Sequence, residues 1–190
     1  MKTKLAALAF ITLTASTGAF AQSQTYTIDS SHTFPSFSYN HMGFTEQTLR
    51  FNKTTGSVTY DPTAKTGSVN IEIDMKSVDT GFGPFDGHIQ GEDFFDTEKY
   101  PTATFTSNEV LFENDVPKKV VGELTIKGIT KPVTLTITSF NQQAHPMLKK
   151  EAIGANAYTN IKRSEFNAGA YAPAVSDDVR INVAIEAIAQ

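Results

Sequence analysis

The chain contains no cysteine and no tryptophan. Without cysteine, neither a disulfide framework nor a thiol-based catalytic or metal site is possible. Basic residues are also scarce: 16 lysines and arginines against 20 acidic residues give a net charge of −4. A mildly acidic surface disfavours nucleic acids and anionic membranes as partners. No GxSxG or SxxK motif and no glycine-rich phosphate loop is present, so the common serine-hydrolase and nucleotide sites find no support.

Long apolar runs are absent except near the N-terminus. Residues 1–21 combine two lysines, a short apolar run and the string Ala19-Phe20-Ala21, which is the pattern of a cleaved signal peptide. The run is shorter than the about 20 apolar residues that a spanning helix needs. We therefore expect an exported, soluble protein without stable membrane insertion, in which residues 22–190 form a single domain.

Alternating apolar and polar residues dominate what remains. Val69 to Met75 is the clearest such segment, and about eight similar ones follow one another at short spacing between Tyr26 and Ile185. In the segment 49–60, Gly56 is interpreted as a break in the alternation. Many short strands at this spacing are typical of all-β barrels and sandwiches. We predict one antiparallel, all-β domain, which closes on itself because open sheet edges invite aggregation.

Residues 81–101 interrupt the alternation. They contain four glycines, two prolines, four phenylalanines and one tyrosine, and only Asp86 to Phe95 are expected to be helical, over one or two turns. So many aromatic side chains in one non-periodic segment need apolar surface to cover. The segment 81–101, called the flap below, is therefore predicted to cover an end or side of a barrel.

A barrel of about eight strands can enclose one small ligand. The many aromatic and branched residues supply an apolar wall, and small residues such as Ala155 and Gly169 leave space beside it. The same residues could equally pack a filled core. Composition alone leaves these two interpretations open.

The histidines form no metal-binding motif. None of the four stands in an HxH, HxxxH or HExxH arrangement, and their separations are long; they are His32, His41, His88 and His145. We therefore predict no metal site. Most of them are expected to bond to backbone groups or to lie at the edge of the core.

Carboxylates surround His88 in the flap. Together with this imidazole, the carboxylates could house acid–base chemistry; they are Asp86, Glu92, Asp93, Asp96 and Glu98. Acidic residues that complement the dipole of a short helix are the simpler interpretation. Arg163 follows a segment of small residues, and we expect it to fix a turn by bonding backbone carbonyls or Asp86.

An ordered series of specific strings runs through the chain. They are Asp29-Ser30-Ser31-His32-Thr33, Phe37-Ser38-Tyr39-Asn40-His41-Met42-Gly43, Val78-Asp79-Thr80-Gly81, Asp86-Gly87-His88-Ile89, Asp93-Phe94-Phe95-Asp96-Thr97-Glu98-Lys99-Tyr100-Pro101-Thr102-Ala103-Thr104-Phe105, Gly122-Glu123-Leu124-Thr125-Ile126-Lys127-Gly128-Ile129-Thr130-Lys131-Pro132-Val133 and Arg163-Ser164-Glu165-Phe166. In this order the strings resemble the signature of the YceI-like family.

This resemblance implies an extended eight-stranded antiparallel barrel, lipocalin-like in shape, with one short helix. It also implies a periplasmic protein that holds a polyisoprenoid lipid, either a quinone such as ubiquinone or a polyprenyl chain, and that needs no cofactor and catalyses no reaction. The expected partner is thus an amphiphilic isoprenoid lipid, with a homodimer possible. The residues expected to contact the lipid are Phe37, Tyr39, His41, Phe44, Phe51, Ile71, Ile73, Phe82, Phe85, Phe94, Phe95, Phe105, Leu135, Ile137, Ile181 and Val183.

The chain departs from the family pattern at several positions. Phe85 stands where members usually carry arginine, and Leu49 stands where they tend to carry glycine. Both departures add apolar bulk, so we expect them to affect the choice of lipid. A subgroup with a similar loop at residues 145–151 tends to carry cysteines at positions that correspond here to Gln142 and Ile153.

Two alternative functions are kept beside lipid binding. The first is a hydrolase or lyase for a hydrophobic substrate, which would use His41 or His88 with a nearby carboxylate. The second is a ligand-free structural protein of the stress response, whose barrel would be filled. The geometry of the histidines and the presence of a cavity distinguish these alternatives.

Overall fold

The computed structural model describes residues 23–190. The predicted signal peptide, residues 1–21, lies outside these residues. Among the described residues, no helix has the length and apolar character needed to cross a membrane. The described part begins with the first strand, whose alternating side chains already point into the core.

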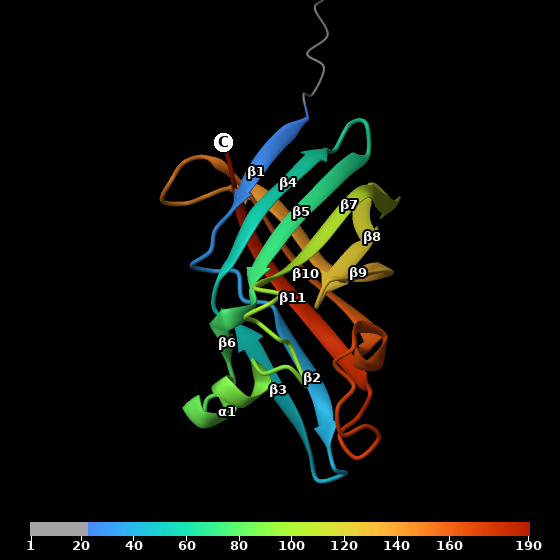
Figure 1. Cartoon of the computed structure of the whole chain (residues 1–190). Coiled ribbons are helices and arrows are strands. Elements are labelled where there is room, and N and C mark those ends of the chain that lie inside the picture. The colour runs from blue at the N-terminus through green and yellow to red at the C-terminus, as the bar shows by residue number, and fades with distance from the viewer. Residues whose placement is uncertain (1–22) are drawn as a thin grey trace, which may run out of the picture.

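Eight strands form a closed antiparallel barrel (Figure 1). Their order is β1-β4-β5-β7-β8-β9-β10-β11, and β11 returns to pair with β1, so that Tyr26 lies opposite Ala189. The bounds are β1 Gln24–Ile28, β4 Thr54–Asp61, β5 Thr66–Asp74, β7 Thr102–Glu113, β8 Val116–Ile126, β9 Ile129–Ala144, β10 Glu151–Lys162 and β11 Asp178–Ala189. The predicted all-β class and the eight-stranded antiparallel barrel are confirmed.

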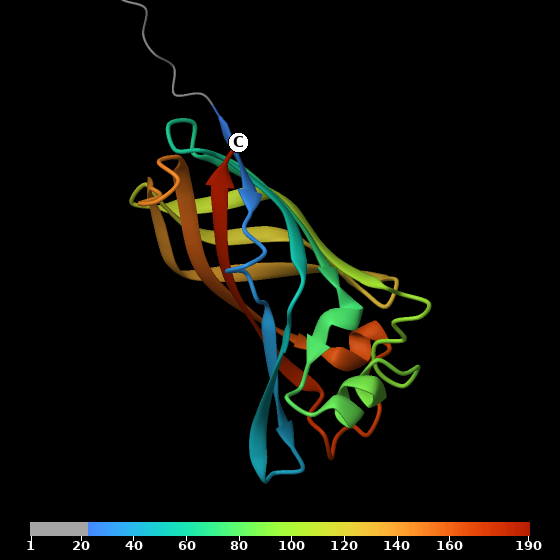
Figure 2. The same cartoon turned by 90° about the vertical axis from the view of Figure 1, so that its left-hand side faces the viewer.

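Three more strands extend the sheet beyond the barrel. β2 (Ser36–His41) pairs with the first half of β11, β3 (Thr45–Phe51) pairs with β2, and the short β6 (Val78–Asp79) pairs with the end of β3. Figure 2 shows the β2–β3 hairpin projecting below the barrel, opposite the end that carries the C-terminus. This extension creates the side wall of a space that the barrel alone would leave open.

The helices all lie near that extension. They are the 3₁₀ turns η1 (Met75–Ser77) and η2 (Arg163–Phe166) and the helix α1 (Gly83–Ile89). α1 begins three residues earlier than predicted because Pro84 occupies its first turn, where a fixed φ favours helix initiation. It ends at Ile89, and the chain continues as turns through the rest of the flap. The prediction of one short helix in the flap is therefore correct in kind, and its boundaries are shifted.

The segment 49–60 is divided at another position than predicted. β3 ends at Phe51 and β4 begins at Thr54, whereas Gly56 lies inside β4 with φ of +143°. A Cβ at Gly56 would lie 2.1 Å from the backbone oxygen of Asn70 on β5. Glycine here permits close approach of two strands instead of ending one.

The core falls into two clusters. The upper cluster fills the barrel near the C-terminal end of β11, and Tyr26, Tyr60, Phe105, Ile153 and Ala187 are among its buried residues. Its aromatic rings are in contact: Tyr60 stacks on Phe112 at a centroid distance of 6.2 Å and meets Phe140 edge to face at 5.3 Å. The lower cluster lies between the β2–β3 hairpin, the flap and the other end of the barrel. The upper half of the barrel is thus packed by side chains, and among the described residues the larger hollow lies around the lower cluster.

Candidate ligand-binding cavity

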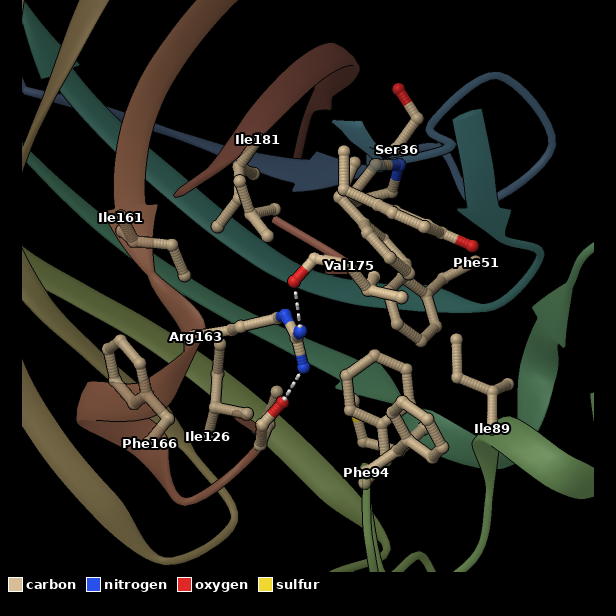
Figure 3. A pocket seen from close by; sticks show the side chains of 18 of the residues that line it. Ser36, Phe51, Ile89, Phe94, Ile126, Ile161, Arg163, Phe166, Val175 and Ile181 are labelled. Atoms are coloured by element: carbon tan, nitrogen blue, oxygen red, sulfur yellow. Dashed lines mark hydrogen bonds between the residues drawn. The ribbon is translucent and has the colours of Figure 1, made fainter. Parts of the chain in front are cut away.

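A cavity of about 330 Å³ lies inside the lower cluster (Figure 3). The residues around it come from β2, the flap, β8, the end of β10 with η2, and the first half of β11. They are Pro35, Ser36, Phe37, Tyr39, His41, Met42, Phe51, Ile73, Met75, Phe85, His88, Ile89, Phe94, Phe95, Ala103, Leu124, Ile126, Ile161, Arg163, Phe166, Ala168, Tyr171, Val175, Val179 and Ile181. Most are aromatic or aliphatic, so the walls present little polar surface.

Three phenylalanines from separate elements form one wall. The ring centroids of Phe37 on β2, Phe51 on β3 and Phe95 in the flap lie 5.7–5.8 Å apart, and Phe95 meets Phe37 edge to face. Contacts of this geometry add about 0.5–1.5 kcal/mol per pair to the free energy of burial. The wall therefore links the flap to the hairpin as well as bordering the cavity.

The flap is attached by hydrogen bonds at both of its ends. The Asp86 carboxylate accepts from the backbone N–H and the hydroxyl of Thr80, at 2.8 and 2.7 Å. At the other end, the N–H of Met75 in η1 donates to the carbonyl of Pro101 at 2.9 Å. The exposed His88 ring stacks on Phe85 and lies 5.0 Å from the Phe94 ring, so its contacts are aromatic.

Arg163 is the only arginine, lysine, aspartate or glutamate among the described residues that line the cavity. Its guanidinium donates to the backbone carbonyls of Ser176, Ala168, Ala170 and Val175 at 2.5–2.8 Å. Figure 3 shows two of these bonds. Burial lowers the pKa of the guanidinium from its usual range. The predicted bonding of backbone carbonyls is confirmed. All four acceptors belong to the loop 167–177, so the guanidinium already has hydrogen-bond partners within the protein.

The two histidines of the cavity lack an acid–base partner. His41 and His88 both line it, yet within residues 23–190 no hydrogen bond joins either ring to a carboxylate. The histidine that does bond a carboxylate is His32, whose Nδ1 lies 2.8 Å from Asp29 in an exposed turn outside the cavity. An acid–base constellation is therefore not assembled here.

That exposed turn also contains a group with ligand atoms suited to a cation. Atoms of Asp29, His32 and Glu186 lie within 4.8 Å of one another. The hydrogen bonds from Ser31 and His32 lower the pKa of the Asp29 carboxyl to about 2, and the Asp29 carboxylate raises the pKa of His32. Among the described residues, Asp29 to His32 form a hydrogen-bonded turn. The hydrogen bonds of this turn explain why the Asp29 and His32 side chains lie close together, without an ion.

Nine of the sixteen residues predicted to contact a ligand line the cavity. They are Phe37, Tyr39, His41, Phe51, Ile73, Phe85, Phe94, Phe95 and Ile181. Phe85, one of the departures from the family pattern, is among them, whereas Leu49, the other, is buried behind the wall in the lower cluster. Contact of the nine with a ligand remains a prediction.

The other seven do not line this cavity. Phe44 and Phe82 are exposed. Ile71 and Phe105 are buried in the upper cluster, and Leu135 and Ile137 pack against it. Val183 borders a separate hollow of about 180 Å³ beside Arg180 and Asn182. Alternation indicates which face of a strand a residue occupies, but it does not indicate how far along the barrel the residue lies.

Several lining residues were not predicted. Met75, Ala103, Leu124, Ile161 and Val179 contribute to the walls. The alternation that placed Ile181 inside also places Val179 inside, since both belong to the same face of β11. Met75 was recognised as part of an alternating segment, but its position after the end of β5, in η1, depends on tertiary structure.

Fold and cavity together define the class: a closed antiparallel β-barrel with an apolar internal cavity. Within that class the relationship is specific. The YceI-like domain profile matches residues 26–187, nearly all of the described chain. The chain belongs to the YceI-like family.

Individual relatives agree with this assignment. The chain is 35% identical over 195 residues to Protein YceI of Escherichia coli O17:K52:H18, with all of both chains covered. It is similar to the crystal structure of Burkholderia cenocepacia BcnA, with a TM-score of 0.70 and 29% identity over 84% of this chain and 98% of the other. A polyisoprenoid-binding domain from Saccharophagus degradans shares the fold, with a TM-score of 0.65 and 17% identity over 88% of this chain and 99% of the other.

Proposed function

We propose that this protein binds an isoprenoid lipid, a quinone or a polyprenyl chain, in the cavity of the lower cluster, and that it carries or sequesters this lipid in the periplasm. The observation that carries the proposal is the apolar lining, in which Arg163 already has four carbonyl partners. A buried site without a free charge favours an uncharged, apolar ligand.

The size of the cavity suits part of a prenyl chain. A volume of about 330 Å³ lies at the lower end of the roughly 300–1,000 Å³ of small-molecule pockets. Each buried CH₂ group contributes about 0.8 kcal/mol, so a few isoprene units suffice for firm binding. The polyisoprenoid-binding domain that shares this fold supports the choice of ligand class.

Polar groups near the wall suit a quinone head. Burial raises the pKa of Tyr39, which keeps its phenol protonated and able to donate a hydrogen bond at neutral pH. Ser36 and His41, at the two ends of β2, also line the cavity. These groups could bond the carbonyl oxygens of a quinone while its tail lies among the phenylalanines.

Binding is favoured over the two alternatives. A hydrolase or lyase would need a polarised histidine in the cavity, and His41 and His88 have no carboxylate partner within residues 23–190. A ligand-free structural role would be expected to leave the barrel filled, whereas the lower cluster surrounds open space.

Organic extraction and native mass spectrometry of the protein purified from cells, followed by uptake of added ubiquinone, test the proposal. We expect a co-purified isoprenoid or stoichiometric uptake of the quinone. Empty protein that takes up neither quinone nor polyprenol would overturn it.

A pair of substitutions on β11 locates the site. Val179→Phe adds bulk to the cavity wall and is expected to reduce quinone uptake about tenfold or more, since it removes space for roughly two CH₂ groups. The matched control is Ile185→Phe on the same strand, in the upper cluster. Overpacking there should lower the free energy of unfolding by about 1–3 kcal/mol and leave uptake unchanged. Equal uptake by the two variants would contradict the assigned cavity.

A further inference from the structure

Four large apolar side chains at one end of the molecule are exposed. The solvent-exposed fractions are 83% for Phe44, 65% for Phe82, 58% for Tyr171 and 52% for Met42. They lie on three separate segments, the tip of the β2–β3 hairpin, the start of the flap and the loop 167–177. Figure 2 shows all three segments at the end of the molecule opposite the C-terminus. We call these four residues the rim.

Two of the four rim residues belong to the cavity wall. Met42 and Tyr171 line the cavity as well as being exposed. The N–H of Met42 donates to the carbonyl of Ala174 at 2.9 Å, which joins the hairpin tip to the loop 167–177. Tyr171 in turn lies 6.0 Å from Phe94 of the flap. Met42 and Tyr171 therefore connect the exposed rim with the apolar wall of the cavity.

The rim segments carry no charge. Residues 42–45, 81–85 and 168–175 contain no aspartate, glutamate, lysine or arginine. The nearest charged residues along the chain are all acidic: Glu46 follows the first segment, Asp79 and Asp86 flank the second, and Glu165 and Asp177 flank the third. Two cations also reach the loop 167–177, since Arg163 and Lys127 donate to its backbone carbonyls, which leaves five acidic residues against two basic ones. A rim with this net negative surround is repelled by an anionic surface and tolerates an electrically neutral one.

The area of the rim argues against a second protein as its main partner. Taking about 200 Å² for a fully exposed side chain of this size, the four expose on the order of 500 Å². A standard protein interface needs about 800 Å² from each partner, with matched hydrogen bonds. Aromatic and methionine side chains at loop tips can instead enter the interfacial layer of a bilayer, which requires no shape complementarity.

We propose that the rim docks on the surface of an electrically neutral, zwitterionic phospholipid bilayer and places the cavity opening against the lipid. Docking is peripheral and reversible. Docking would let an isoprenoid tail pass between bilayer and cavity without crossing water. This role rests on the proposed function, whereas docking itself does not.

The absence of tryptophan from the chain provides the test. Phe44→Trp places a single fluorescent reporter in the rim, and Leu148→Trp places one in the exposed loop 145–150 at the opposite end of the barrel. With phosphatidylcholine vesicles, we expect a blue shift of the Phe44→Trp emission and none for Leu148→Trp. Phosphatidylglycerol vesicles should bind more weakly than phosphatidylcholine at low salt.

Further substitution in the reporter background measures the contribution of the rim. Phe82→Ser is expected to weaken partitioning into phosphatidylcholine vesicles about tenfold, because it removes one large apolar side chain from the contact. Met147→Ser, which removes an equally exposed apolar residue at the other end, should change nothing. A Phe44→Trp emission that does not respond to vesicles, or that shifts with protein concentration alone, overturns the proposal; the latter result would indicate a second copy as the partner.

Quinone uptake separates docking from ligand binding. Phe82→Ser should slow uptake from quinone-containing phosphatidylcholine vesicles and leave uptake from ethanol solution unchanged. If vesicles shift the reporter but quinone enters from neither source, the proposed function fails and docking stands. If quinone enters equally fast from both sources in the wild-type and variant proteins, while the reporter shows no response, docking fails and the proposed function stands.

Discussion

Replacement of Arg163 by leucine should destabilise the protein more than replacement of any exposed arginine. The guanidinium satisfies the carbonyls of Ser176, Ala168, Ala170 and Val175. A hydrogen bond from a charged donor contributes about 1.5–3 kcal/mol net, and four at the lower value contribute about 6 kcal/mol. Part of the loop borders solvent, and carbonyls that become hydrated recover about half of this loss. We therefore expect the free energy of unfolding to fall by about 3 kcal/mol.

Urea denaturation followed by far-UV circular dichroism measures this change, because the chain has no tryptophan to report on unfolding. The matched control is Arg180→Leu on β11, whose guanidinium is exposed, stacks 3.9 Å above the Tyr158 ring and bonds one side chain. Its loss should cost about 1 kcal/mol or less. Arg163→Lys should recover only part of the loss, since an ammonium has three donors and no planar fork. A difference below about 1 kcal/mol between the two leucine variants would refute the assigned role.

Three further predictions follow from individual contacts. Gly56→Ala should lower the free energy of unfolding by about 3 kcal/mol or more, because its Cβ would overlap the backbone of β5; a urea midpoint equal to that of wild type would contradict this. Asp86→Ala should release the flap from Thr80, which limited proteolysis would detect as faster cleavage near residue 81; unchanged cleavage would count against that attachment. In the folded protein the pKa of Asp29 is lowered from 3.8 to about 2, so the stabilisation that Asp29 contributes is lost as pH falls from 3.8 towards 2. The folded pKa of His32 is raised from 6.5, so the stabilisation that His32 contributes is lost as pH rises above 6.5. His32→Gln should abolish the second loss in urea midpoints measured against pH, and an identical profile for the variant would argue against it.

The alternation of apolar and polar residues indicated which face of a strand each residue occupies. It did not indicate how far along the barrel that residue lies. On β5, Ile73 lines the cavity and Ile71 is buried in the upper cluster; on β11, Ile181 lines it and Val183 does not. The two members of each pair have the same parity, and they are separated by about 7 Å along the strand. That distance is enough to pass from the open half of the barrel to the filled half. Which half is filled depends on how the Tyr60, Phe112 and Phe140 rings meet, and these rings come from three strands.

Turn residues were the second source of error. Phe44 and Phe82 were among the residues expected, from the family resemblance, to contact the lipid. Phe44, however, follows Gly43, which has φ of +77°, and its N–H donates to His41 across the turn, so its side chain lies at the hairpin tip. Hydrophobicity does not reveal the direction of a side chain where the backbone reverses. The covering role of the flap could be predicted, because its aromatic residues had no other apolar surface to bury against.

The filled upper half of the barrel makes the cavity a dead end. A chain that enters does so tail first, and it leaves by the opening through which it came. In the proposed complex, the head of the molecule would be the last part to enter and would stay nearest the outside, where Tyr39 and His41 of the lining are candidate partners. For a quinone this order would leave the ring that accepts electrons within reach of a redox partner while its tail stays stored. A cavity with a single opening, unlike a tube open at both ends, could expose the bound quinone for reaction without releasing it.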